Sequence, residues 1–166
     1  VISNDGTTVL FAACSESLDS VATYSFNTTT SALQLVGIAD FGFEITGLAF
    51  NSQLYLAALV YGQSLIMRAD IDSQGQITNA ASFYSLPTNV PLGDSFGLAV
   101  YNAEELVFSA ANRMYHLNIA RLNLCGPLLG DQTGTNTTLE NISIFGTQAW
   151  VSEGDSIAVY NITQEA

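Results

Sequence analysis

The sequence predicts an all-β fold, a β-propeller of about four four-stranded blades or an arc of a larger propeller. A four-residue phrase recurs: a small or aromatic residue, a polar residue, a large apolar residue, then Asn, Asp or Thr. It stands at Tyr24–Asn27, Ala69–Asp72, Tyr115–Asn118 and Tyr160–Thr163, with starting points 45, 46 and 45 positions apart. Propeller blades repeat with a period of about 40–50 residues. The apolar runs are short and bounded by turn residues, and no segment sustains a helical period.

Aligned on this phrase, each repeat supplies four strands. The expected inner strands carry small residues, which suit crowding around a central channel: Gly47–Phe50, Gly97–Val100 and Ile142–Phe145. The expected second strands follow turns rich in Asn, Asp and Gly: Val9–Phe11, Leu54–Leu56, Leu106–Phe108 and Ala149–Val151. The phrase itself lies in the third strand. The expected outer strands alternate apolar and polar residues, as an edge strand does: Ala32–Gly37, Gln76–Ala80 and Leu122–Gly126.

The domain prediction is one propeller domain over residues 1–166, with repeats at about 1–44, 45–94, 95–140 and 141–166. The first and last repeats are incomplete. The chain opens late in a first inner strand and stops after a fourth third strand. An incomplete blade leaves unpaired strand edges that need a cover. We expect that cover to come from further residues, from another chain, or from a ring closed between the two termini.

The stretch from Tyr24 to Ala57, YSFNTTTSALQLVGIADFGFEITGLAFNSQLYLA, carries the pattern LxLVG, then ITGLAF, then LY. It resembles the propeller repeats of many bacterial secreted and surface proteins. The copy from Ala69 to Phe108 matches more loosely, and the copy from Tyr115 to Val151 has lost the GLAF core. The resemblance implies a fold and no particular activity, because propellers of this kind include lactonases, lectins and scaffolds.

The charge balance argues against two classes of partner. The chain has no lysine, its cations are Arg68, Arg113 and Arg121, and its formal net charge is −12. Nucleic acids and anionic membrane surfaces both attract clustered Lys and Arg. No apolar run approaches the roughly 20 residues of a membrane span. We therefore expect no nucleic-acid partner and no membrane partner.

The composition favours an extracellular or cell-surface protein. Charged residues make up only 11% of the chain. Glycosylation sequons begin at Asn27, Asn136, Asn141 and Asn161. The first residue is Val1 rather than Met, which fits a removed signal peptide or a fragment of a longer protein.

The candidate metal ligands are Glu44, Asp94 and Glu140, in the loops that enter the inner strands. Carboxylates converging at the channel mouth could bind Ca²⁺, or act as a general base on a lactone or phosphoester. The alternative, which we favour, is that they are solvated loop acids. The single histidine, His116, takes the place of Ser25, Asp70 and Asn161 in the other repeats, and we expect it to be exposed.

The aromatic residues divide into two groups. Tyr24, Tyr115 and Tyr160 align across the repeats, as do Tyr55 and Trp150, which favours core packing. Tyr61, Tyr84 and Tyr101 fall in or near loops and are candidates for a contact surface, for example one that stacks on sugars.

The cysteines are Cys14 and Cys125, in the first and third repeats. In a ring these positions would lie too far apart for a disulfide. Three alternatives stay open: buried thiols, an interchain disulfide, or partners elsewhere in the protein.

These observations favour a non-enzymatic extracellular propeller with a structural or interaction role, because no catalytic constellation is evident. It would assemble through its open blade edges with copies of itself or with a protein partner, into a surface layer or fibre, and could also contact glycans. The alternatives are a calcium-dependent, lactonase-like hydrolase and a carbohydrate-binding module.

Overall fold

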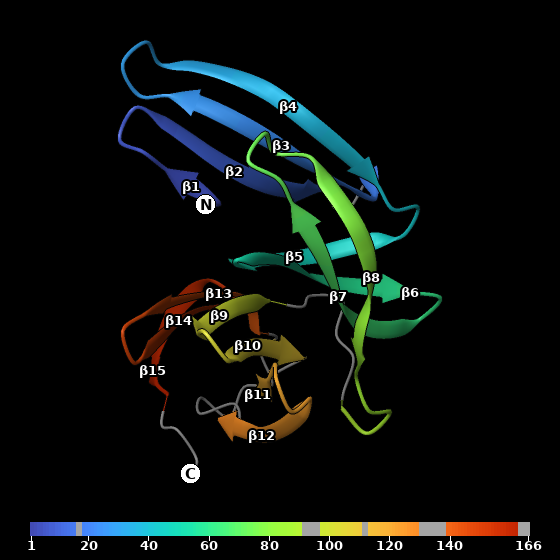
Figure 1. Cartoon of the computed structure of the whole chain (residues 1–166). Helices are drawn as coiled ribbons and strands as arrows, with labels where there is room; N and C mark the ends of the chain where they lie inside the picture. Colours follow the sequence, from blue (N-terminus) through green and yellow to red (C-terminus); the bar gives the residue numbers. More distant parts are fainter. Residues whose placement is uncertain (16–17, 91–96, 111–112, 130–138, 163–166) are drawn as a thin grey trace. The chain divides into compact units, whose positions relative to one another are not determined.

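The computed structural model describes residues 1–15, 18–90, 97–110, 113–129 and 139–162, and they form antiparallel β-sheets (Figure 1). The first sheet has the order β1-β2-β3-β4, from Ser3–Asn4, Thr8–Ser15, Ser20–Asn27 and Ala32–Asp40. The second has the order β5-β6-β7-β8, from Glu44–Asn51, Gln53–Val60, Gln63–Ile71 and Ile77–Ser85.

The third sheet has the order β9-β10-β11-β12, from Leu98–Asn102, Glu105–Ala110, Arg113–Asn118 and Asn123–Leu129. The fourth sheet has three strands among the described residues, β13-β14-β15, from Leu139–Phe145, Gln148–Glu153 and Ser156–Asn161. Every sheet is a meander in which each strand pairs with its neighbours in sequence, which is the topology of a propeller blade. The all-β propeller prediction is confirmed.

The repeated phrase marks the end of the third strand and the turn that follows it. Asn27 Oδ1 accepts hydrogen bonds from the backbone N–H groups of Thr29 and Thr30, both at 2.9 Å. In the second sheet, Asp72 Oδ1 accepts from the backbone N–H groups of Gln74 and Gln76, and in the third, Asn118 Oδ1 accepts from that of Arg121. These side chains hold the chain in a turn, so Asn or Asp suits the last position of the phrase.

The chain divides into two compact units, Val1–Leu86 and Pro87–Ala166. In the first unit, the core lies between the first and second sheets and is built from Val21, Ile45, Leu54, Leu56, Ala58, Met67 and Ala69. A polar contact supplements it: the hydroxyl of Thr23, fully buried, donates to the carbonyl of Gly75 at 2.6 Å. The side chain of Gln76 also donates to the carbonyl of Val36.

In the second unit, the core lies between the third and fourth sheets and is built from Ala99, Val107, Met114, Leu139, Ile142, Ala149, Val151, Tyr160 and Ile162. Ser109 connects the two sheets. Its Oγ accepts from the N–H of Gly97 at 2.9 Å and donates to the carbonyl of Glu140 at 3.2 Å. Gly97 lies so close to this carbonyl that a Cβ would overlap it. The residue just before β9 is therefore a glycine for a packing reason.

None of the described segments forms a helix with the length and apolarity that a membrane crossing would need. The prediction of one domain over residues 1–166 stays a prediction.

Candidate functional site

The three candidate metal ligands cannot be compared as a set, because Asp94 lies outside the described residues. Glu44 begins β5 and is half-buried, whereas Glu140 lies in β13 with an exposed side chain. Within the described part of the chain, no group of three or more His, Cys, Asp and Glu side chains could hold a metal ion. The calcium site stays a prediction.

The three candidate contact tyrosines have different surroundings. Tyr61 is fully exposed at the tip of the hairpin between β6 and β7, where its φ of 50° and the φ of 80° at Gly62 fit a tight hairpin turn. Tyr84 is half-buried, and this burial raises the pKa of its hydroxyl. Tyr101 packs against the core of the second unit, with its ring edge-on to His116. Of the three, only Tyr61 has a fully exposed side chain.

The sequon asparagines that the structure describes are accessible to different degrees. Asn141 and Asn161 are exposed, and Asn27 is half-buried in its turn. Asn136 lies outside the described residues. Whether any of the four carries a glycan stays a prediction.

The two cysteines lie in different units. Cys14 is half-buried in β2 and packs against the core of the first unit. Cys125 is half-buried in β12, where its sulfur accepts a hydrogen bond from the side chain of Asn123 at 3.6 Å. An interchain disulfide stays a prediction for both.

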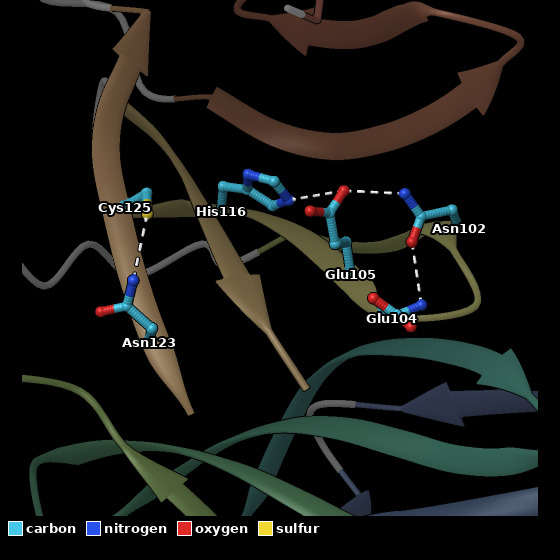
Figure 2. A network of polar contacts seen from close by, with 6 residues as sticks. All are labelled: Asn102, Glu104, Glu105, His116, Asn123 and Cys125. Atoms are coloured by element: carbon cyan, nitrogen blue, oxygen red, sulfur yellow. Dashed lines mark hydrogen bonds and ion pairs between the residues drawn. The ribbon is translucent and has the colours of Figure 1, made fainter. Parts of the chain in front are cut away.

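His116 is buried, so the expectation of an exposed histidine was wrong. Its Nε2 lies 3.1 Å from Glu105 Oε2, and the side chains point toward each other from adjacent strands (Figure 2). The geometry of this contact is not that of a hydrogen bond, and the two side chains form an ion pair only when the imidazole ring is protonated. Asn102 Nδ2 donates to the same carboxylate oxygen at 2.7 Å. His116 is covered because its face of the third sheet packs toward the fourth, whereas the aligned Asn161 lies on an uncovered face.

The fourth sheet presents an apolar outer face. Alternate residues of β14 and β15 point into the core, among them Ala149, Val151 and Tyr160. The residues between them point away, and Trp150, Ile157 and Val159 remain 46%, 71% and 46% exposed. Trp150 was expected in the core together with Tyr55. Tyr55 is buried, but the expectation for Trp150 was wrong.

This outer face is also hollowed. A groove of about 360 Å³ is lined by Asn141, Ser143, Trp150, Ser152 and Ile157. Phe145, 79% exposed, continues the same face at the end of β13. Among the described residues, β14 is the one strand that pairs with β15, which is therefore the outermost described strand of this sheet. Successive side chains of a strand point to opposite faces, so the sequence of β14 and β15 could have revealed this apolar face. Trp150, Ile157 and Val159 all lie on it.

The first sheet has an apolar outer face of its own, on the side opposite Thr23. Leu33, Leu35 and Ile38 of β4 are 60%, 50% and 64% exposed. Beside Leu35, the rings of Tyr24 and Phe11 stack with their centroids 5.5 Å apart. Contiguous exposed apolar surface of this kind is uncommon on monomeric proteins and typically marks an interaction site.

No family model matches the chain, and no curated protein matches it. Solved structures do. The chain aligns with a gluconolactonase, XC5397 from Xanthomonas campestris, with a TM-score of 0.62 at 18% identity over 98% of this chain and 55% of that one. It aligns with TolB from Acinetobacter baumannii, with a TM-score of 0.58 at 12% identity over 95% of this chain and 39% of that one. It also aligns with a virginiamycin B lyase from Staphylococcus aureus, with a TM-score of 0.57 at 14% identity over 93% of this chain and 48% of that one.

The chain thus spans about half the length of the structures that it matches. At these identities the likeness concerns the fold alone. The structural neighbours are bacterial β-propeller proteins, and the chain shares their blade architecture.

Proposed function

We propose that this chain is a non-enzymatic propeller module that assembles through its uncovered blade faces with a second copy of itself. The observation that carries the proposal is the apolar outer face of the fourth sheet, around Trp150, Ile157 and Val159. In a propeller, the apolar face of one blade packs on the next blade, as in the cores of both units. The exposed face of the fourth sheet has the same apolar composition, so another blade would suit it as a partner.

Two arguments favour a second copy as the occupant. The chain covers 48% to 55% of the lyase and gluconolactonase chains, so two copies supply about the length of one such propeller. Each unit, taken by itself, also carries an apolar sheet face, on the first sheet in one unit and on the fourth sheet in the other. A contact between the fourth sheet of one copy and the first sheet of another would be heterologous, and such contacts close into rings or extend into filaments. Further residues of a longer protein, or a different protein, are the alternative occupants.

The test is the oligomeric state of the purified chain, measured by native mass spectrometry and by light scattering across a concentration series. We expect a reversible dimer or higher assembly. Ile157→Lys places a charge on the outer face and should shift the chain to monomer. Leu122→Lys introduces the same charge at an exposed apolar residue between β11 and β12, and should leave assembly unchanged. A monomer at all concentrations, or equal behaviour of the two variants, would exclude self-assembly through this face.

We further propose that the protein works outside the cell or at the cell surface and carries glycans on its sequons. The exposure of Asn141 and Asn161 and the small share of charged residues support this. The intact mass of the protein from its native source tests the proposal. Mass above that of the polypeptide that an N-glycosidase removes would support it, and an unmodified mass would contradict glycosylation.

A second candidate is a calcium-dependent hydrolase of lactones. The likeness to a gluconolactonase favours it, and Glu44 and Glu140 with Asp94 are its candidate ligands. Isothermal calorimetry with CaCl₂ on the intact chain tests it. The absence of a binding signal at millimolar calcium would exclude this mechanism.

A further inference from the structure

A polar pocket of about 230 Å³ opens on the second sheet, outside any site considered above. It lies over β6, β7 and β8 and is lined chiefly by Gln53, Arg68, Asp70, Asn79, Ser82 and Phe83. All of these residues belong to the first compact unit. Arg68 is one of only three cationic residues in a chain of net charge −12, which makes its position in a pocket informative.

Asp70 is held in place as a carboxylate. Gln53 Nε2 donates to its Oδ1, and Asn79 Nδ2 donates to its Oδ2, both at 2.9 Å. These two hydrogen bonds, from Asn79 first and Gln53 second, lower the pKa of Asp70. Each carboxylate oxygen can accept a second hydrogen bond, so the group can still receive two donors from a ligand.

The local backbone positions Asn79 for this contact. The β7–β8 ladder shifts register between Arg68 and Asp70, so that β8 carries an extra residue there. Asn79 lies at this bulge with a φ of 54°, in the left-handed region. Bulges redirect side chains, and residues held in left-handed conformations occur often at functional sites. Here the bulge turns the Asn79 amide onto Asp70.

Arg68 supplies the donor side of the pocket. Its guanidinium carbon lies 4.6 Å from the centroid of the Phe83 ring, and the Tyr55 ring meets Phe83 edge-on with centroids 5.8 Å apart. Among the described residues, Arg68 takes part in no ion pair. The face of the ring attracts the cation, while the N–H groups of the guanidinium stay available for hydrogen bonds.

From this juxtaposition of an oriented carboxylate, a guanidinium over an aromatic ring and two side-chain amides in one small pocket, we propose that the second sheet binds a single sugar ring, a neutral polyol. Each sugar hydroxyl can both donate and accept, so neighbouring hydroxyls can donate to Asp70 and accept from Arg68. Arg68 and Asp70 carry opposite charges side by side, so a ligand with a single positive or negative charge is repelled by one of them. The volume lies below the roughly 300–1,000 Å³ of sites for drug-sized ligands, which suits one ring.

The test is an NMR titration of the intact, isotope-labelled chain with D-glucose, D-galactose and D-mannose and with their methyl glycosides, up to about 50 mM. We expect saturable shifts of amide resonances in β7 and β8 for at least one sugar. Binding of the methyl glycoside would identify the ligand as a residue of a glycan, and binding of the reducing sugar alone would identify a free monosaccharide. No saturable shift with any of the six probes overturns the proposal.

Two variants test the assignment to this pocket. Asp70→Asn keeps the shape of the side chain and should weaken binding about tenfold or more, because a hydrogen bond to a charged group contributes about 1.5–3 kcal/mol. Asp155→Asn makes the same change in an exposed turn of the other unit and should leave affinity unchanged. The amide spectrum of each variant reports whether the fold is kept, and Arg68→Gln supplies an independent test if Asp70→Asn unfolds. Equal affinity in the wild type, Asp70→Asn and Arg68→Gln would exclude this pocket as the site.

Discussion

Asp70 makes a pH-dependent contribution to the stability of the chain. Its pKa is lowered from an ordinary value of 3.8 by the hydrogen bonds of Asn79 and Gln53. A carboxyl whose pKa is lower in the folded state than in the unfolded state stabilises the fold above the unfolded value. This contribution is lost as the pH falls through the folded value. We therefore expect Asp70→Asn to lower the urea midpoint at pH 7 and to differ little from wild type near pH 2.

The difference between the two proteins is the quantity to measure, because Asp5 also has a lowered pKa, from the backbone N–H groups of Thr8 and Thr7. Both proteins share this background. Asp155→Asn, which makes the same change in an exposed turn, is the matched control for the substitution itself. A difference for Asp70→Asn that is as large at pH 2 as at pH 7 would show that its hydrogen bonds do not favour the charged form.

Thr23 makes a buried hydrogen bond that joins two sheets, and its loss should be costly. Thr23→Val keeps the shape of the side chain but leaves the carbonyl of Gly75 without its 2.6 Å donor. An unsatisfied buried acceptor costs about 1–3 kcal/mol, so we expect the free energy of unfolding to fall by this amount. Thr78→Val, on the exposed surface of β8, should change it by less than about 0.5 kcal/mol. Urea denaturation measures both, and equal effects would contradict the role given to Thr23.

At the scale of the element, Gly97 sets how closely β9 approaches β13. A Cβ at this position would overlap the carbonyl of Glu140, and the backbone of Gly97 is also held by Ser109. We expect Gly97→Ala to destabilise the protein by about 2 kcal/mol or more, because main-chain atoms of two packed sheets must separate. Thermal denaturation followed by circular dichroism measures the change.

Gly6→Ala serves as the comparison for this prediction. Gly6 has open space around it but a φ of 89°, so its substitution reports backbone strain without a steric clash. That strain amounts to about 1–2 kcal/mol. If Gly97→Ala proved no more destabilising than an exposed Ala substitution, the close packing of β9 on β13 would be wrong.

The strands were predictable from the sequence because their causes are local. The phrase recurs because its last residue caps a turn, as the hydrogen bonds of Asn27, Asp72 and Asn118 show. Alternation of apolar residues located the strands between these turns. The candidate sites were less predictable. His116 and Trp150 were both misplaced, because burial depends on which face of a blade meets a neighbour, and no property of the single strand records this.

At the scale of the whole molecule, the repeat predicts the strands of each blade but not which blade faces are covered. Repeats place equivalent residues on equivalent faces, so a repeat alignment predicts equal burial for them. Tyr55 and Trp150 break this rule, at 4% and 46% exposure. The exposed face of the fourth sheet has the apolar composition of a packed one, and this supports the proposal that a second copy covers it.

The net charge of −12 gives the proposed self-assembly a distinctive dependence on salt. Two copies repel each other at long range, while the proposed interface is apolar and gains nothing from ion pairs. The Debye length falls from about 30 Å at 0.01 M salt to about 8 Å at 0.15 M, so added salt screens this repulsion. We expect the apparent dissociation constant of the assembly to fall several-fold between 10 and 150 mM NaCl, as measured by sedimentation velocity. Interfaces built on opposite charges weaken over the same range. An assembly that dissociated as salt was added would therefore contradict an apolar contact between like-charged copies, even if its stoichiometry were the expected one.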